Sequence, residues 1–251
     1  MKTLKFNCQC HDKIISYKLI GDLINNGYDF YCESSTLASH FDYLCFFDSR
    51  GISAGYKGSI IEGIRNYLTK KNFSYLIIAR PLGLTTWATL YNFLHINKIN
   101  ASSLIANLGF VDFTPKKIDV LDNVIEQVNY YMGDIASSKF IQMYESINGS
   151  SIPLYITEYN KEFYEKIQKM VDQFNKVFII NTPYVLPHIS FPRVRPASFY
   201  DSLIKTSNFN KKLKVHKTID LGVIGERETY DAVHYTKFGS KLILDKLMIN
   251  F

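Results

Sequence analysis

The sequence predicts an α/β protein in which a mainly parallel sheet is covered by helices on both faces. Short apolar runs recur along the chain and alternate with stretches whose apolar residues fall at helical spacing. This alternation is typical of a parallel sheet, because helices connect the strands of such a sheet. Hydrophobic residues make up 47% of the 251 residues, which is enough for a large core. A chain of this length commonly forms one α/β domain.

The expected strands are short and almost continuously apolar. The first, FDYLCFF at residues 41–47, has the pattern of a strand buried on both faces of a parallel sheet. Further strands are expected at residues 75–79, 103–113, 177–180 and 218–221. Helical spacing predicts helices at residues 58–71, 85–94, 117–132, 163–174 and 197–215, and a last helix from Thr236.

The first 40 residues are expected to be an N-terminal elaboration packed on a main domain at residues 41–251. Apolar runs at residues 3–8 and 13–20 predict two strands, with a hairpin as one arrangement. A turn then leads to a short strand at residues 28–32. None of these segments carries an obvious chemical motif.

The net charge of +6 does not by itself predict a nucleic-acid partner. The Lys residues are scattered, and no run of five or six like charges occurs, so a solvated surface accounts for the charge. No stretch of 18 apolar residues occurs, and the N-terminus lacks the apolar run of a secretion signal. We therefore expect a soluble cytoplasmic protein without a membrane span.

The four cysteines lie in the first fifth of the chain and are expected to be reduced, partly buried thiols. They are Cys8, Cys10, Cys32 and Cys45. Cys8 and Cys10, with His11, are spaced too closely for a zinc site, and no second Cys/His pair follows. The sequence therefore predicts no metal.

The clearest chemical motif pairs Asp231 with His234. A carboxylate three residues before a histidine can hold one ring nitrogen and leave the other free to act as a general base. Ser49 follows the strand at residues 41–47, and the carboxyl ends of parallel strands carry the site in open α/β sheets. Ser49 is therefore the expected nucleophile, with Ser53 in reserve. The plainer alternatives are a turn serine and a structural histidine.

The string D-x-x-H-x-T-x-x-G from Asp231 to Gly239 resembles the last conserved block of the SGNH hydrolases, also called the GDSL esterase/lipase superfamily. Three upstream segments resemble earlier blocks in the same order. Asp48-Ser49 is similar to Gly-Asp-Ser, with Phe47 in place of the glycine. Gly83 precedes a Thr-rich helix start. The third block here has Val111 where the family has an asparagine.

The resemblance spans roughly residues 41–250 and implies a flavodoxin-like three-layer α/β/α sandwich with a mainly parallel five-stranded sheet. It also implies a serine esterase that removes an O-acyl group, expected to be O-acetyl, from a small molecule or a glycan. Ser49 would be the nucleophile, His234 the base and Asp231 its partner. The backbone N–H groups of Ser49 and Gly83 would form the oxyanion hole, and no cofactor is required.

Val111 supplies no side-chain donor to that oxyanion hole. Losing one such donor typically lowers turnover by about 10²–10³. Asn107 is a poor substitute, because four residues of extended strand correspond to roughly 13 Å, and Asp112 is expected to cap the following loop. Two alternatives stay open: a non-catalytic SGNH-like protein that binds a glycan or partner, and an O-acyltransferase with the same triad.

Two loop segments are expected near the site. Residues 133–158 contain Gly, Ser and Asn and are interpreted as an irregular insertion that could overhang it. The loop after residues 177–180 carries His188, Arg193 and Arg195, which could bind an anionic or hydroxyl-rich substrate. Surface arginines beside proline are the plainer interpretation of the last two.

Overall fold

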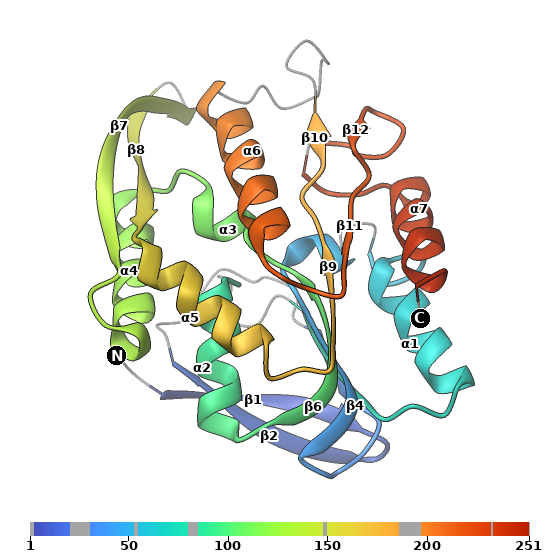
Figure 1. Ribbon diagram of the computed structural model, residues 1–251. Coiled ribbons are helices and arrows are strands. Elements are labelled where there is room, and N and C mark those ends of the chain that lie inside the picture. The colour runs from blue at the N-terminus through green and yellow to red at the C-terminus, as the bar shows by residue number, and fades with distance from the viewer. Residues whose placement is uncertain are drawn as a thin grey trace.

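A computed structural model describes residues 3–20, 31–52, 55–79, 85–147, 150–185, 197–231 and 233–250. Its centre is a sheet with helices on both sides (Figure 1). Five strands of this sheet are parallel. They are β4 (His40–Phe47), β5 (Tyr75–Ala79), β6 (Asn100–Asn107), β9 (Lys176–Ile180) and β11 (Lys217–Ile219).

The parallel strands have the flavodoxin order. Across the sheet these five strands lie in the order β5, β4, β6, β9 and β11. This order is 2-1-3-4-5 when the five are numbered along the chain. The predicted fold class is therefore confirmed. In this topology the order reverses between β4 and β6, and ligands typically bind beyond the carboxyl ends of the strands at that point.

The central strands are buried on both faces, as predicted. Along β4, Leu44 and Phe46 belong to the core on one side of the sheet, whereas Cys45 and Phe47 belong to the core on the other. Successive side chains of a strand point to opposite faces, so a continuous apolar run is required when helices cover both.

Two groups of helices cover the sheet (Figure 1). Helices α1 (Ile60–Lys70) and α7 (Lys237–Met248) supply one core, and the second core takes side chains from α2 (Trp87–Asn97), α4 (Ile118–Met132) and α5 (Lys161–Val171). Helix α6 (Ala197–Lys212) contacts the short helix α3 (Phe110–Phe113). No helix in the described ranges has the length and apolar character needed to cross a membrane.

The N-terminal strands extend the same sheet to eight strands. Strands β1 (Thr3–Cys10) and β2 (Lys13–Ile20) form an antiparallel hairpin, and β3 (Tyr31–Ser34) pairs with both β1 and β5. The expected strand at 28–32 begins outside the described residues. This elaboration therefore continues the sheet edge beside β5.

The prediction of four reduced thiols is wrong for two of them. Cys8 and Cys32 form a disulfide with a Cα–Cα distance of 4.7 Å. Their pairing follows from the sheet, because Gln9 pairs in parallel register with Glu33 and the preceding residues lie side by side. Cys10 and Cys45 are free and buried.

The prediction of an irregular insertion at residues 133–158 is also wrong. Strands β7 (Ala136–Ile147) and β8 (Ser150–Tyr159) form a long antiparallel hairpin that contacts α4. A second small sheet joins β10 (Tyr184–Val185) to β12 (Val223–Ile224). That the hairpin overhangs the site stays a prediction.

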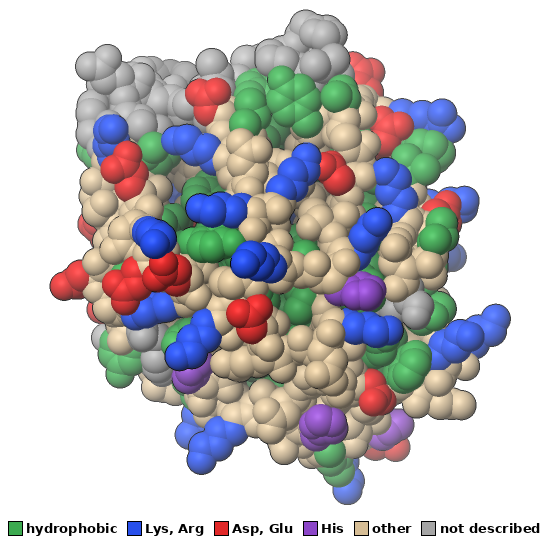
Figure 2. Space-filling view, in the orientation of Figure 1, with side chains coloured by type: hydrophobic (Ala, Val, Ile, Leu, Met, Phe, Trp, Pro, Cys, Tyr) green, Lys and Arg blue, Asp and Glu red, His purple; other side chains and the backbone are tan. Residues whose placement is uncertain are grey.

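The surface charge is mixed on the face seen in Figure 2. Lys and Arg side chains are interspersed there with Asp and Glu, and no single-sign region covers it. This distribution agrees with the scattered lysines of the sequence. It gives no support on this face to a phosphate-binding track.

Candidate functional site

Ser49 lies where the sheet order reverses. It begins a short 3-10 helix (Ser49–Ile52) directly after β4, and the backbone N–H of Asp48 donates to the carbonyl of Asn107 at the end of β6 (3.1 Å). Ser49 is partly buried. Phe47 is fully buried in the core and faces the α1 side of the sheet, so its side chain does not cover Ser49.

The structure brings Ser49, His234 and Asp231 together. Ser49 Oγ lies 3.1 Å from His234 Nε2, and His234 Nδ1 lies 2.8 Å from Asp231 Oδ2. A carboxylate can only accept, so the proton of the neutral imidazole belongs on Nδ1 and Nε2 is left as an acceptor for the Ser49 hydroxyl. The ring is thus oriented to accept a proton from serine.

The Asp231 carboxylate is held by the backbone as well as by the ring. Its Oδ1 accepts from the N–H groups of Val233 (3.0 Å) and His234 (2.7 Å). Partial burial acts to raise the pKa of Asp231, but the hydrogen bonds from His234 outweigh it and lower that pKa to about 2. Asp231 is therefore a fixed anion at neutral pH.

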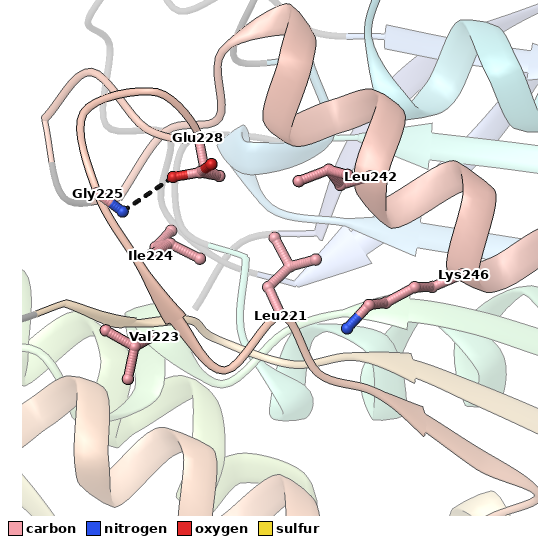
Figure 3. Close-up of a pocket in the computed structure, with 7 residues that line it drawn as sticks. All are labelled: Leu221, Val223, Ile224, Gly225, Glu228, Leu242 and Lys246. Atoms are coloured by element: carbon pink, nitrogen blue, oxygen red, sulfur yellow. Dashed lines mark hydrogen bonds between the residues drawn. The ribbon is translucent and has the colours of Figure 1, made fainter.

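The segment that presents Asp231 and His234, here called the base loop (residues 225–231 and 233–236), is tied to its own backbone. The Thr229 hydroxyl and the Tyr230 N–H both donate to the His234 carbonyl, at 2.8 and 3.2 Å. At the start of the loop, the Gly225 N–H donates to the Glu228 carboxylate (3.0 Å; Figure 3). These bonds hold the base loop in one conformation.

Thr236 and Gly239 join the base loop to α7. Thr236 caps the helix by accepting from the Gly239 N–H (3.1 Å) and donates to the Arg227 carbonyl (2.6 Å). A Cβ on Gly239 would lie 2.1 Å from the Glu228 carbonyl oxygen, so only glycine fits. The Thr and Gly of the D-x-x-H-x-T-x-x-G string therefore have a structural reason to be there.

A buried ion pair beneath Ser49 was not predicted from the sequence. Arg50 Nη2 lies 2.7 Å from Asp48 Oδ2, and Arg50 Nη1 donates to Thr182 Oγ1 (2.7 Å). Both charged residues are 1% exposed, and the guanidinium also lies over the Phe110 ring. The pair ties the two neighbours of Ser49 to the end of β9. The opposite charges of Asp48 and Arg50, on either side of Ser49 in the sequence, could have suggested this ion pair.

Tyr230 is a second residue that sequence reasoning missed. Its ring stacks on His234 with a centroid distance of 5.7 Å and an angle of 14°, and it is 46% exposed. A tyrosine four residues before a histidine carries no signal in a loop, because loop residues have no fixed periodicity. In the structure its ring forms an exposed apolar surface next to the imidazole.

Val111 and Asn107 are the two residues considered as side-chain donors for the oxyanion hole that the sequence predicts. Val111 is partly buried in α3 and has no hydrogen-bonding side chain. Asn107 is fully buried and donates to the Ile180 carbonyl (2.8 Å), so its amide bridges β6 and β9. Within the described ranges, no residue accepts from the Ser49 backbone N–H.

Asp112 does not cap the following loop, so that prediction is wrong. Both its carboxylate oxygens lie 3.2 Å from the N–H of Trp87, at the start of α2. Burial raises the pKa of Asp112 to about 7. Burial also lowers the pKa of nearby Lys116 to about 8.

Several predicted site residues lie outside the described residues. These are Gly83, Ser53, His188, Arg193 and Arg195. Their roles stay predictions. Within the part of the chain that is described, no group of three or more His, Cys, Asp or Glu could hold a metal ion.

A cavity of about 370 Å³ lies behind the base loop, between β12 and α7 (Figure 3). Leu221, Ile224 and Leu242 line it, with Glu228 and Lys246. The Lys246 amine donates to the Asp220 carbonyl (2.6 Å). The cavity therefore touches the segment that positions His234 without containing any of the three site residues.

Comparisons with known proteins give weak similarity. No protein-family model matches the chain, and no curated protein matches it. Among solved structures, an acetyl xylan esterase, AlAXEase, is 16% identical with a TM-score of 0.45, and the match covers 82% of this chain and 98% of that one. An esterase domain from a Rhodothermus marinus protein is 12% identical with a TM-score of 0.34, covering 100% and 97%. We draw no function from either.

Proposed function

We propose that the protein is a serine esterase of the SGNH type that hydrolyses an O-acyl ester. The observation that supports this best is the continuous chain of contacts from Ser49 Oγ through His234 to Asp231. These three residues come from two segments that lie 185 residues apart in the sequence. A structural histidine would not need a serine hydroxyl and an anionic carboxylate on opposite ring nitrogens.

The reaction has two steps. Ser49 Oγ attacks the ester carbonyl while His234 Nε2 takes the hydroxyl proton, and the same nitrogen then protonates the departing alcohol. An acyl-enzyme remains on Ser49. Water attacks this ester with His234 again as base, which releases the carboxylic acid and restores Ser49. Asp231 keeps the imidazole oriented and stabilises its protonated form.

The oxyanion would be held by the backbone N–H groups of Ser49 and Gly83. Val111 leaves this hole without the side-chain donor of the SGNH family. We therefore expect turnover about 10²–10³ below that of an enzyme with the full set of donors. The substrate class follows from the resemblance alone: an O-acetyl ester, with a carbohydrate as the alcohol.

Active-site labelling tests the proposal. The purified protein is treated with a fluorophosphonate, and mass spectrometry locates the modified residue. We expect modification at Ser49 that is abolished in His234→Ala, because only an activated hydroxyl reacts. Modification at Ser53 would assign the reserve nucleophile. An unlabelled but folded protein, judged by its thermal transition, would contradict the proposal.

A non-catalytic binding protein is the second candidate, and Val111 favours it. A site that keeps its triad but lacks an oxyanion donor could retain a ligand without turning it over. Stable binding of an acetylated oligosaccharide with no acetate release, unchanged in Ser49→Ala, would support this candidate. Release of acetate that requires Ser49 would exclude it.

A further inference from the structure

A second cavity, of about 580 Å³, lies at the other end of the sheet from Ser49. It is bounded by the ends of β1 and β3 and by the turn between α1 and β5, and Tyr75 at the start of β5 lines it. The opposite end of β5, Ala79, pairs with Phe47 near Ser49. Four residues of strand correspond to roughly 13 Å. The two sites are therefore separate.

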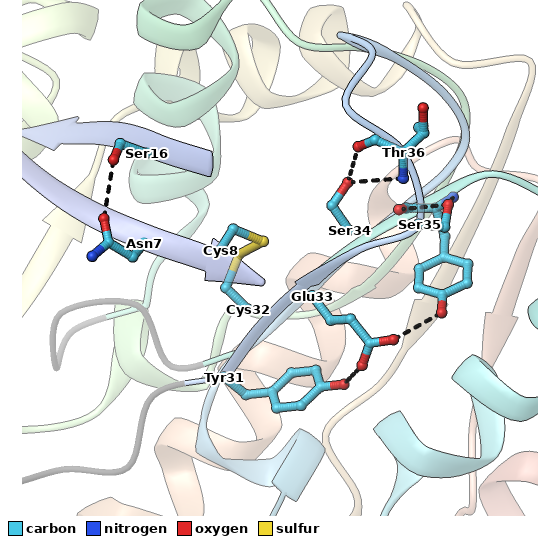
Figure 4. Close-up of a disulfide and its surroundings, with 10 residues drawn as sticks. Asn7, Cys8, Ser16, Tyr31, Cys32, Glu33, Ser34, Ser35 and Thr36 are labelled. Atoms are coloured by element: carbon cyan, nitrogen blue, oxygen red, sulfur yellow. Dashed lines mark hydrogen bonds between the residues drawn. A yellow bond between two sulfur atoms is a disulfide. The ribbon is translucent and has the colours of Figure 1, made fainter. Parts of the chain in front are cut away.

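The walls of this cavity are fixed. Gln9 and Glu33 both line it and pair in the sheet, and the Cys8–Cys32 disulfide joins the residues directly before them. The Glu33 carboxylate accepts a hydrogen bond from the Tyr31 hydroxyl (Figure 4). It also accepts one from the Tyr75 hydroxyl, at 2.9 Å. A carboxylate held in this way is preorganised for a ligand.

The charges in the cavity compensate each other. Arg65 Nη1 lies 3.7 Å from Glu33 Oε1, and these are the only carboxylate and guanidinium among the described residues that line the cavity. Because neither charge is in excess, the cavity offers no net attraction to an anion or a cation. A neutral ligand suits it better.

The remaining lining groups include polar donors and acceptors. They include the side chains of Gln9, His11, Thr69 and Asn72, beside the partly buried ring of Phe73. Amides, hydroxyls and an imidazole can both donate and accept, as sugar hydroxyls do, and an aromatic face suits the C–H face of a sugar ring. The volume falls within the range of about 300–1,000 Å³ typical of small-molecule sites.

We propose that this cavity is a second, non-catalytic site that binds a neutral carbohydrate. The site belongs to the N-terminal strands and the α1–β5 turn, so it does not depend on the proposed esterase activity. It gives β1 and β3 a role beyond extending the sheet.

At two residues of the cavity, a side chain can be removed without straining the backbone. His11 and Asn72 have φ angles of 50° and 57°, where glycine is unstrained, so His11→Gly and Asn72→Gly remove side chains without forcing the backbone. Lys98 has a φ of 51° and lies outside the cavity. Lys98→Gly is therefore the matched control.

The test is a titration of ¹⁵N-labelled protein with xylohexaose, cellohexaose, maltohexaose and chitohexaose, and with inorganic phosphate, followed by NMR. We expect at least one oligosaccharide to bind saturably, with the largest shifts at Gln9, Glu33 and Asn72. The dissociation constant should rise about tenfold in each glycine variant, the loss of one hydrogen bond, and stay unchanged in Lys98→Gly and Ser49→Ala.

Other outcomes overturn the inference. Absence of binding by all four oligosaccharides, binding of phosphate instead, or shifts confined to the surroundings of Ser49 would each exclude a carbohydrate site here. Equal affinity in the parent and both cavity variants would do the same. Since Ser49→Ala is included, failure of this site and failure of the esterase assignment are separate results.

Discussion

Gly239 and Glu228 are in direct backbone contact: a Cβ on Gly239 would lie 2.1 Å from the Glu228 carbonyl oxygen. The same oxygen accepts from the Thr236 N–H (2.9 Å). The first turn of α7 therefore packs against the base loop. The position of His234 depends in this way on Gly239, which lies outside the site. The D-x-x-H-x-T-x-x-G string thus includes a purely structural position.

Gly239→Ala should separate the base loop from α7. The methyl group would force the Glu228 carbonyl away, and a misplacement of about 1 Å in a catalytic group can lower the rate about 10²-fold. We expect fluorophosphonate labelling of Ser49 to slow by about that factor while the protein stays folded. Labelling rate and thermal unfolding are measured on the same preparation.

Gly222→Ala is the control for this substitution. Gly222 has a φ of +70°, and no atom lies within 4 Å of the place that an alanine methyl group would occupy, so alanine costs backbone strain of about 1–2 kcal/mol without a clash. It should lower stability yet leave labelling unchanged. Equal labelling in parent and Gly239→Ala would show that the contact does not position His234.

Asp231→Asn should remove a pH dependence of stability below pH 4. The pKa of Asp231 is lowered to about 2 in the folded protein, so its contribution is present above its unfolded pKa and is lost as pH falls toward 2. The contribution is on the order of 2 kcal/mol. Urea unfolding between pH 2 and 6 measures it, and parallel curves for the two proteins would contradict the lowered pKa.

Asp112→Asn should act in a different window and with the opposite sign. Burial raises the pKa of Asp112 to about 7, so the folded state keeps a proton that the unfolded state has lost, and stability falls as pH rises from 4 to 7. Asparagine keeps an oxygen for the Trp87 N–H and cannot ionise. We expect the variant to be more stable than the parent at pH 7.5, by on the order of 4 kcal/mol.

Unfolding at pH 4 and pH 7.5 checks this difference. Lys116 is coupled to Asp112, because burial lowers the pKa of Lys116 to about 8 while the Asp112 charge raises it, so both measurements are kept below pH 8. If parent and variant differed equally at both pH values, the carboxyl would be an ordinary ionised group. The stability difference between parent and variant would then come from the change in side-chain shape and not from ionisation.

The sequence was informative where local pattern decides structure. The continuous apolar run of β4 specifies a strand buried on both faces, and the D-x-x-H spacing places Asp231 and His234 on one turn of chain. Ser49 follows a buried strand, which places it at the carboxyl ends of the parallel strands, where sites lie in open α/β sheets. These inferences needed only short-range information.

Contacts between distant segments were not predictable in the same way. The bond between Asp112 and the Trp87 N–H joins two residues that are 25 positions apart in the sequence, and no spacing in the chain encodes it. The pairing of β1 with β3 was not predictable either, because an apolar run predicts a strand but does not indicate which strand lies next to it in the sheet. The regular β7–β8 hairpin was missed because the Gly, Ser and Asn residues of the 133–158 segment are also typical of irregular loops.

The Cys8–Cys32 disulfide gives a final prediction. It closes a loop with a sequence separation of 24 residues, for which the chain-entropy estimate of stabilisation is about 3 kcal/mol. Dithiothreitol should lower the urea midpoint of the parent and leave a Cys8→Ala/Cys32→Ala protein unaffected. Without reductant, denatured parent should expose two reactive thiols, Cys10 and Cys45; four would contradict the disulfide.

The same thiol count tests the compartment. Cytosolic thiols are kept reduced, and structural disulfides are characteristic of oxidising compartments. Acid quenching of intact cells followed by alkylation in denaturant preserves the state of each cysteine and reaches the buried Cys10 and Cys45. Four alkylated residues would support the cytoplasmic location expected from the sequence. Two alkylated residues, with Cys8 joined to Cys32, would contradict it and show that the disulfide next to Gln9 and Glu33 is present in the protein in cells.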